Sequence, residues 1–531
     1  MKYEKNENIK KKQKKEEKMK RRTKKFDRNK GITLIALVIT IIVLLILAGV
    51  SIATLTGSNG LITRTNQAKE ETEKAGAKEK VQMEAAGSFD NYGKFNMDKL
   101  KENLKDNLGL TDEDIKDNPD GSITVTIDGY EVTVDSNGNV TVGEEATKPE
   151  EPELPEDTSG ANHPELKDGM QAITFAENGT AQPVADSSKK DWYSYEETTD
   201  EDMTDGGTTD GGNSRWANAT LNGNYYVWIP RYAYKIDNSV TYTSQSGTSH
   251  KIEVQFIGTN VTSSNVGTEV GEGWIVHPAF TFGGKELTGI WIGKYTTSGN
   301  TTTPTILPNE NILGNINASM MFNTAQKLST TNYDAHMMKN TEWGAVAYLA
   351  QSKYGRNGTE ISRNQCADMY TGTGAGTGTN KIYNSPYAWN NATEEQKYNG
   401  EIGKLSSTTG NIYGVYDMSG GAYEYVMGVY GTQENPSAGS SGFTKFPDSK
   451  YYDLYTKTTA DSSNIGDALY ETKGWNTTMA NADNFVNSNM IFFVRGGAID
   501  TGGVLGGEFY FFSMDGGSSN LYGFHTVVTV K

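Results

Sequence analysis

The pattern of apolar and polar positions divides the chain at one long apolar run. Residues 31–56 read GITLIALVITIIVLLILAGVSIATLT, and no ionisable side chain occurs between Gly31 and Thr63. About 20 apolar residues are enough to cross the hydrocarbon core of a bilayer, so this run predicts a transmembrane helix. Residues 1–30 carry 15 Lys/Arg and five Asp/Glu, and such a basic leader is typical of the cytosolic side of a membrane span. The rest of the chain is therefore expected outside the cell.

Beyond the apolar run, the pattern predicts a helical stem, a small module and a linker. Residues 57–87 place Val81 and Ala85 at helical spacing, which favours a stem. Residues 88–143 read as a short helix followed by three alternating strands with Asp-Gly and Asn-Gly turns, a small helix-plus-meander head. Residues 144–160 are rich in proline and carboxylates, which predicts a stiff, self-repelling linker.

Residues 161–531 are predicted to form one large, loop-rich domain of mixed strands and helices, so the fold class is α+β. Strand patterns occur at 224–231, 251–257 and 289–295, and a helix is expected over 340–352 with Asn340 or Thr341 as its cap. Its expected apolar face includes Ala345 and Leu349.

Charge and residue counts exclude several kinds of function. After residue 30 the chain holds 34 basic and 61 acidic residues, and such an acidic body argues against a nucleic-acid partner. A single cysteine, Cys366, cannot form an internal disulfide or a thiolate cluster. The five histidines show no metal-ligand spacing, so no cofactor is expected from this pattern.

The entry to the apolar run, Lys30-Gly31-Ile32-Thr-Leu-Ile, resembles the prepilin cleavage signature of type IV pilins and pseudopilins. The resemblance implies cleavage after Gly31 by prepilin peptidase, N-methylation of Ile32 and packing with other pilins. Ala36 stands where the family usually has Glu, which suggests a minor or tip subunit or a protein that stays in the membrane. A plain signal anchor through 31–56 is the alternative.

Four later segments resemble the formylglycine-generating-enzyme family, which has a C-type-lectin-like fold. They are Asn340-Thr-Glu-Trp343, Gly414–Val426 (GVYDMSGGAYEYV), Val494-Arg-Gly-Gly-Ala498 and Tyr522-Gly-Phe-His525. The resemblance implies a structural role for the residues that carry these motifs: Trp343, Asp417, Met418, Gly420, Glu424, Arg495, Gly496, Gly497, Gly523 and Phe524.

The chemistry of that family is not expected here. Its oxidase needs a pair of cysteines and this chain has one, so no catalytic residue is predicted and the chain is expected not to be an enzyme. The family also binds calcium beside the second motif. Because Gly421 replaces the family's Asn, Glu424 alone stays as a candidate calcium ligand.

The lectin-like fold also serves as a binding platform in the target proteins of diversity-generating retroelements, where its last part is varied to change the ligand. By resemblance, the window between Arg495 and His525 is the candidate ligand-binding region. Exposed aromatic residues among small polar ones suit recognition. The candidates are Ala498, Asp500, Leu505, Glu508, Tyr510, Phe512, Met514, Asp515, Ser518, Asn520, Tyr522 and His525. Phe509 and Phe511 are interpreted as core residues of an alternating strand.

Together these features predict a membrane-anchored or pilus-associated protein that displays a lectin-like domain at the cell surface and binds a protein or glycan. A structural minor pseudopilin of a secretion or uptake machine is the first alternative. An enzyme of the formylglycine-generating type is the second.

Overall fold

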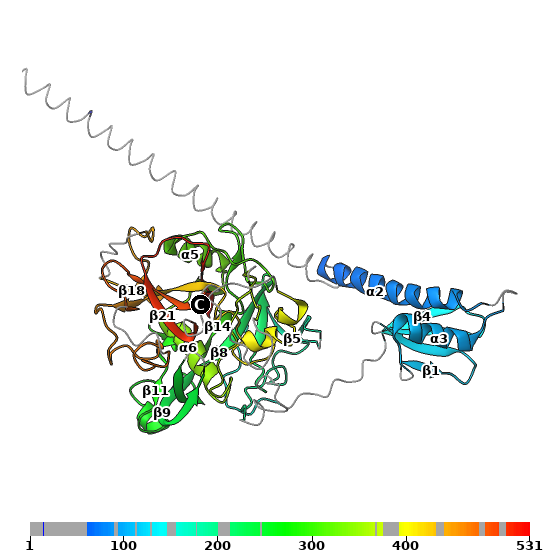
Figure 1. The fold of residues 1–531 in the computed structure, drawn as a ribbon, viewed down its shortest axis with the longest axis horizontal. Coiled ribbons are helices and arrows are strands. Elements are labelled where there is room, and N and C mark those ends of the chain that lie inside the picture. The colour runs from blue at the N-terminus through cyan, green and yellow to red at the C-terminus, as the bar shows by residue number, and fades with distance from the viewer. Residues whose placement is uncertain are drawn as a thin grey trace, which may run out of the picture. The chain divides into compact units, whose positions relative to one another are not determined.

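The structure is a computed structural model. It describes residue 14 and residues 61–89, 94–111, 114–127, 130–145, 156–176, 178–199, 213–244, 247–366, 369–374, 392–431, 440–476, 484–498 and 506–531. The chain divides into two compact units, Met1–Pro152 and Glu153–Lys531. Both combine helices with antiparallel sheet, as the α+β prediction requires (Figure 1).

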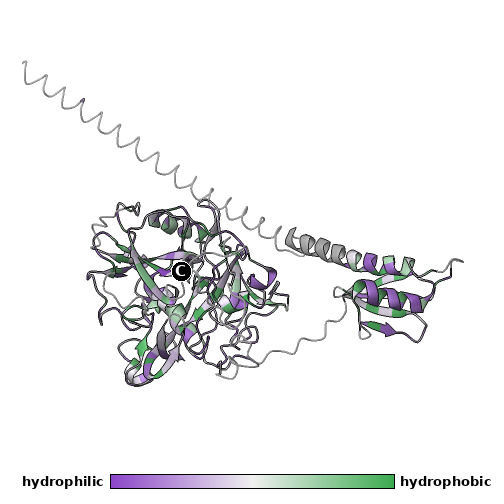
Figure 2. Ribbon diagram, viewed as in Figure 1, coloured by the Kyte–Doolittle hydropathy of each residue, from purple (hydrophilic) through white to green (hydrophobic). Residues whose placement is uncertain are grey.

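The small unit is built from two helices and a four-stranded antiparallel meander of order β1-β2-β3-β4. Its elements are α2 (Leu61–Ala86), α3 (Met97–Leu108), β1 (Ile115–Asp117), β2 (Ile123–Ile127), β3 (Tyr130–Val134) and β4 (Val140–Glu145). Asn96 caps α3 by accepting a hydrogen bond from the Lys99 amide, and Gly109 ends the helix in a left-handed conformation. Both helices carry hydrophilic as well as hydrophobic residues (Figure 2).

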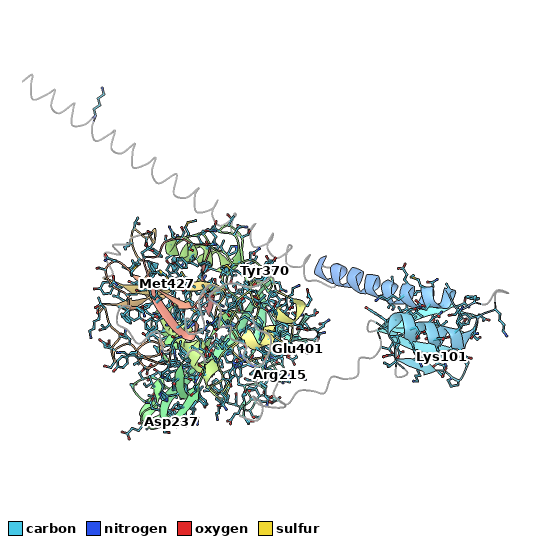
Figure 3. All side chains as sticks on the ribbon, viewed as in Figure 1. Lys101, Arg215, Asp237, Tyr370, Glu401 and Met427 are labelled. Carbon is cyan, nitrogen blue, oxygen red and sulfur yellow. The ribbon has the colours of Figure 1, made fainter. Side chains whose placement is uncertain are left out.

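The predicted stem and the predicted module share one hydrophobic core. Ala77, Val81 and Ala85 of α2 are buried against the inward-facing residues of β2 and β3. A separate stem over 57–87 therefore does not describe the last turns of α2, because their apolar side chains pack on the sheet. At the surface, Lys101 of α3 reaches Asp117 of β1 at 2.6 Å (Figure 3).

The large unit contains two main sheets. The first has seven strands in the order β17-β23-β14-β8-β7-β5-β6, all paired antiparallel. They span β5 (Met170–Phe175), β6 (Ala181–Pro183), β7 (Asn218–Leu221), β8 (Asn224–Pro230), β14 (Gly289–Gly293), β17 (Tyr333–Met337) and β23 (Thr526–Val530). The second sheet has the order β19-β18-β20-β21, with β22 added parallel to β18. They span β18 (Tyr423–Tyr430), β19 (Asp453–Tyr455), β20 (Phe492–Gly496), β21 (Gly507–Met514) and β22 (Tyr522–Gly523).

Smaller elements complete the unit. A three-stranded sheet has the order β10-β9-β11 and consists of β9 (Tyr232–Thr243), β10 (Thr248–Phe256) and β11 (Ile275–Val276). Figure 3 labels Asp237 of β9 at the lower edge of this unit. Two antiparallel strand pairs are separate from it: β12 (Thr281–Phe282) with β13 (Lys285–Glu286), and β15 (Ser298–Gly299) with β16 (Pro304–Thr305). The helices are α4 (Val266–Glu269), α5 (Ala318–Ala325), α6 (Asn340–Gln351) and the short 3-10 turns Pro278–Phe280, Gln326–Leu328, Glu394–Gln396, Gly403–Ser406 and Ser449–Tyr451.

Helix α6 lies at the centre of the large unit. All but one of its residues are buried, including Ala345 and Leu349 of the predicted apolar face, and the helix contacts β10, β18 and the turn Pro278–Phe280. Neither predicted cap acts as one. The Glu342 carboxylate accepts from the Lys339 amide at 2.8 Å, and Asp453 of β19 accepts from the Thr341 amide at 2.7 Å. Two carboxylates thus neutralise the positive end of the helix.

The large unit begins earlier than the predicted residue 161. The Asp157 carboxylate is buried and accepts a hydrogen bond from the Tyr195 amide at 2.8 Å. Among the residues that the structure describes, no helix is long and apolar enough to cross a membrane. The predicted span 31–56 and the processing residues Lys30, Gly31 and Ile32 lie outside the described residues.

Candidate functional site

The predicted motif residues are all buried in the large unit. They are Trp343, Asp417, Met418, Gly420, Glu424, Arg495, Gly496, Gly497, Gly523 and Phe524. At Gly420, φ is +79°, and a Cβ atom there would lie 2.3 Å from the carbonyl oxygen of Asn364. Only glycine permits that approach. The polar members separate into two clusters, one around Glu424 and one around Arg495.

The first cluster joins the second motif to the C-terminal one. His525 Nδ1 lies 2.5 Å from Glu424 Oε2, and Thr296 donates its hydroxyl to Glu424 Oε1 at 2.6 Å. Asp417 accepts hydrogen bonds from the Gly372 amide at 3.0 Å. This contact holds the segment that follows α6 against the core.

Burial and neighbouring opposite charges shift the pKa values of Asp417 and His525 in this cluster. Burial raises the pKa of Asp417 to about 6, with His525 acting in the other direction. Burial opposes the charge of His525, but the Glu424 and Asp417 carboxylates still hold its pKa above the usual value. Both Glu424 oxygens are engaged within the fold. Within the described ranges, no group of three His, Cys, Asp or Glu side chains could hold a metal ion, and calcium at Glu424 stays a prediction.

The second cluster is centred on the Arg495 guanidinium, which is completely buried. It donates to the Asn340 side chain at 3.3 Å and to the carbonyl oxygens of Asp467, Ala468 and Glu508 at 3.1, 3.2 and 3.4 Å. Its carbon lies 5.5 Å from the centre of the Trp343 ring, within cation–π range. Burial lowers its pKa to about 10, so it is cationic at neutral pH.

Next to Arg495, strand β21 carries a bulge of three residues. Gly496 pairs with Gly507, but the neighbouring Arg495 pairs with Phe511, so residues 508–510 of β21 have no counterpart on β20. The carbonyl of Glu508 is thereby released from the ladder. It accepts instead from Trp343 Nε1 at 2.7 Å and from Arg495. Bulges of this kind bend a strand and redirect its side chains, and they are common beside binding sites.

The bulge forms one wall of a cleft of about 320 Å³, a volume that includes the part open to solvent. Glu508 and Phe509 line it from β21, Gln351 from the end of α6, and Glu360 from the segment that follows. Trp475 and Asn476 line it from the segment before β20. Ser244 lines it from the turn after β9, and Ser249 from β10. Four segments far apart in the sequence therefore meet at this cleft.

Polar contacts fix the walls of the cleft. Gln351 Nε2 donates to Ser249 Oγ and to the His250 carbonyl, both at 3.0 Å. Asn476 Nδ2 donates to the Gly506 carbonyl at 2.9 Å. The rings of Trp475 and Phe509 meet edge to face at 4.8 Å.

Glu508 is the most strongly perturbed carboxyl group at the cleft. Its side chain is 3 % exposed. Burial raises its pKa to about 8, the neighbouring Glu360 carboxylate adds to the rise, and Arg356 and Arg363 oppose it. The group therefore carries a proton at neutral pH, and perturbed carboxyls in clefts are markers of functional sites.

The predicted ligand-binding residues fall into four groups: buried, exposed, half-buried and outside the described residues. Ala498, Glu508, Tyr510 and His525 are buried. For Ala498, Tyr510 and His525 the prediction of an exposed contact is wrong, because the first two lie beside the bulge and the third pairs with Glu424. Ser518 and Asn520 are exposed, and Phe512, Met514, Asp515 and Tyr522 are half-buried. Asp500 and Leu505 lie outside the described residues. Phe509 and Phe511 belong to the core, as predicted.

Half-buried aromatic and thioether side chains lie on the sheet of β18 and β21: Tyr423, Phe512, Met514 and Tyr522. This set is called the recognition face below, after the ligand-binding region that the sequence predicts here. Phe512 pairs with Val494, which pairs with Tyr425, so these side chains and Tyr423 share one face of the sheet. Tyr522 donates its hydroxyl to Met514 Sδ at 3.3 Å, and its ring lies 6.1 Å from that of Tyr423. Helix α5 packs over another part of this face, including Phe492.

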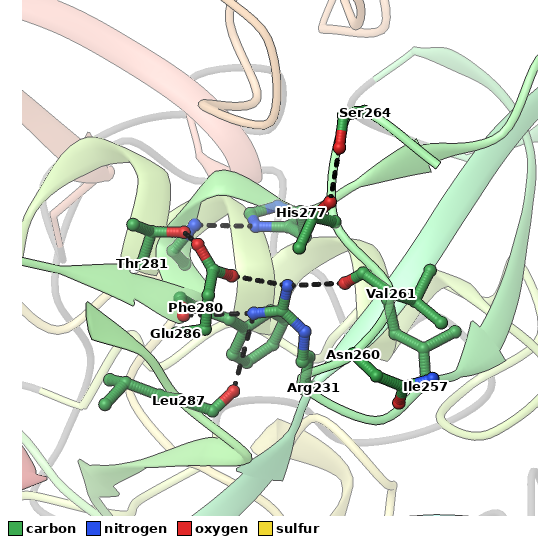
Figure 4. Close-up of polar contacts among 12 residues, drawn as sticks. Arg231, Ile257, Asn260, Val261, Ser264, His277, Phe280, Thr281, Glu286 and Leu287 are labelled. Atoms are coloured by element: carbon green, nitrogen blue, oxygen red, sulfur yellow. Dashed lines mark hydrogen bonds and ion pairs between the residues drawn. The ribbon is translucent and has the colours of Figure 1, made fainter. Parts of the chain in front are cut away.

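Two further buried cations have structural roles. Arg231 donates to the carbonyls of Phe280 and Val261 at 3.1 and 2.9 Å and forms an ion pair with Glu286 at 2.5 Å (Figure 4). It joins the connection between β8 and β9 to the turn Pro278–Phe280, to β13 and to the loop that contains Val261. Lys294 donates to Asn218 Oδ1 and to two carbonyl oxygens at 2.6–3.0 Å, and burial holds its pKa well below the usual value. Its three hydrogen bonds satisfy the ammonium group.

Sequence reasoning found Glu508 but missed its neighbours at the cleft. Trp475, Gln351 and Asn476 belong to no motif. Each lies more than 30 residues before β21 in the sequence. A tryptophan beside an asparagine was the one signal present at 475–476. It becomes informative only once the fold places it opposite the bulge.

We expect the free energy of unfolding to depend on pH through the proton on the buried Glu508 carboxyl group. Between pH 5 and pH 8 the folded state keeps a proton that the unfolded chain, with a usual pKa of 4.5, has lost. The free energy of unfolding should therefore fall with rising pH by at most about 1.4 kcal/mol per unit from this group. Urea unfolding of the wild type and Glu508→Gln should agree near pH 5 and diverge by pH 8, with the variant more stable. A constant difference across this range would contradict the buried proton.

Comparisons with known proteins leave the family of this chain open. No protein-family model matches the chain, and no curated protein matches it.

Proposed function

We propose that this chain is a surface-displayed binding protein. In this proposal a pilin-like or anchoring segment, 31–56, holds the chain at the membrane, and a lectin-like large unit binds a protein or glycan outside the cell. The recognition face of Tyr423, Phe512, Met514 and Tyr522 is the single observation that carries it. The face lies in the same C-terminal window that the resemblance marks for ligand binding.

The composition of the recognition face supports a binding role. Tyrosine and phenylalanine offer large contact areas with few rotatable bonds, and methionine adapts to the shape of a partner. Asp515, Ser518 and Asn520 add polar groups beside this apolar centre, and the last two are exposed. An aromatic centre with a polar rim is typical of interfaces that bind other molecules.

The buried motif clusters support the lectin-like part of the proposal. Glu424 contacts His525, and Trp343 contacts Arg495, although the residues of each pair lie more than 100 positions apart in the chain. Such contacts give the resembled motifs a shared structural role in holding the loops of the large unit. The enzyme alternative has less support, because Cys366 is the single cysteine of the chain and is buried.

Binding through the recognition face can be tested on cells that produce the full chain. Retention on a panel of immobilised glycans and intact bacterial cells should fall at least tenfold for Phe512→Ser and Tyr522→Ser, since central aromatics often contribute more than about 1.4 kcal/mol to binding. Leu454→Ala, on the exposed part of β19, is the matched control and should bind as the wild type does. Thermal unfolding of each variant separates lost contact from lost fold. Unchanged retention by both serine variants would refute the proposed face.

Display through a processed leader makes a separate prediction. Mass spectrometry of the protein from cell-surface preparations should find a mature chain that begins with N-methylated Ile32. An N-terminal peptide from residues 1–30 in the same preparation would instead support an uncleaved signal anchor. Lys30→Ala is a suitable control, because the anchor reading predicts no change in the N-terminus.

A further inference from the structure

We propose that the cleft beside the β21 bulge binds a primary ammonium group, such as the end of a lysine side chain in a protein ligand. This inference rests on the proposed binding function and adds the chemistry of one contact. The cleft lies at the start of β21, whereas Phe512 and Met514 of the recognition face lie toward its end. One ligand could therefore engage both parts of the strand.

Glu508 is the group that points to a cation. Its carboxyl group is buried and lines the cleft, and no other side chain in the described part of the chain donates a hydrogen bond to it. Burial disfavours the charged form of this carboxyl group, and an entering cation would compensate that charge. The Glu360 carboxylate lines the same cleft, so two acidic groups share it.

The nearby protein cations do not fill this role. Arg356 is buried and donates to the carbonyls of Thr359 and Leu405. Arg363 is buried behind Gly506, where a Cβ atom would lie 2.7 Å from the guanidinium carbon. Neither lines the cleft, and the Glu508 carboxyl keeps a raised pKa despite both. His250 on β10 is a further titratable group near the cleft, with its ring 5.7 Å from that of Trp475.

The rest of the lining also suits an ammonium group. Trp475 and Phe509 supply aromatic rings, which attract cations through their π faces. Gln351 uses its amide nitrogen for Ser249 and His250, which leaves its oxygen as an acceptor. The hydroxyl oxygens of Ser244 and Ser249 are further acceptors. An ammonium group needs three acceptors and no donor.

Binding of a cation should release a proton. At neutral pH the Glu508 carboxyl is protonated, and a bound ammonium favours the carboxylate. The balance is a protonated carboxyl plus an ammonium giving a carboxylate–ammonium pair and one free proton. Affinity should therefore rise as the pH increases from 6 to 8, while an alkylamine with a pKa of about 10.4 stays charged.

The experiment is calorimetric titration of the full chain in detergent with n-butylammonium chloride. Phosphate and HEPES buffers at pH 7 differ in ionisation enthalpy, so the two heats give the number of protons released. We expect saturable binding in the millimolar range, as befits so small a probe, with release approaching one proton. Neutral 1-butanol should bind at least tenfold more weakly.

Three variants make the test specific. Glu508→Gln should weaken butylammonium binding at least tenfold and abolish proton release. Glu360→Gln leaves Glu508 in place but removes the neighbouring negative charge, so it should weaken binding and reduce the release. Glu253→Gln is the matched control, because Glu253 is half-buried on β10, where it pairs with Lys251, and it should change neither quantity.

The outcomes separate this inference from the proposed function. Absence of saturable butylammonium binding, equal binding of 1-butanol, or unchanged binding by both Glu508→Gln and Glu360→Gln would overturn the ammonium site. If cells still bind through Phe512 and Tyr522 in that case, the proposed function stands. If butylammonium binds with proton release, but Phe512→Ser and Tyr522→Ser leave retention on glycans and cells unchanged, the cleft is supported and the recognition face is refuted.

Discussion

The buried guanidinium of Arg495 is the constraint on which the architecture of the large unit depends. A charge removed from water must be compensated, and Arg495 achieves this by donating to one side chain and three carbonyl oxygens. These acceptors belong to three different segments: the start of α6, the turn at 467–468 and strand β21. Loss of such a buried charge typically costs about 3–5 kcal/mol, because its partners are left unsatisfied.

The same interaction explains the geometry of the candidate site. Strand β21 can depart from the ladder at residues 508–510 because Arg495 and Trp343 satisfy the released Glu508 carbonyl. With the main chain of Glu508 fixed, its side chain lies in the cleft with Glu360 and Trp475. A structural motif residue thus positions a candidate binding residue. The second half of β21 returns to regular pairing and presents Phe512 and Met514 on the recognition face.

The sequence predicts local structure better than the assembly of segments. Alternation gives β2 and β3 their bounds and identifies Phe509 and Phe511 as core residues. The same alternation wrongly predicts an exposed Tyr510. The bulge inserts three residues into the strand, and an alternating pattern of apolar and polar residues does not reveal such an insertion. Helix α6 has the predicted apolar face, but its polar residues are buried too, because partners elsewhere in the fold bind them, as Arg495 binds Asn340. The cleft depends on the distant residues Trp475 and Gln351, which no local pattern connects.

The central claim is that Arg495 holds the β21 bulge and with it the cleft. Hydrogen exchange of the full chain with Arg495→Lys tests this most directly, since lysine keeps the charge but lacks the planar fork of donors. We predict faster exchange at 506–511 and at the start of α6, with the core of the small unit at 123–134 unchanged as an internal reference. Exchange at 506–511 equal to that of the wild type would contradict the claim.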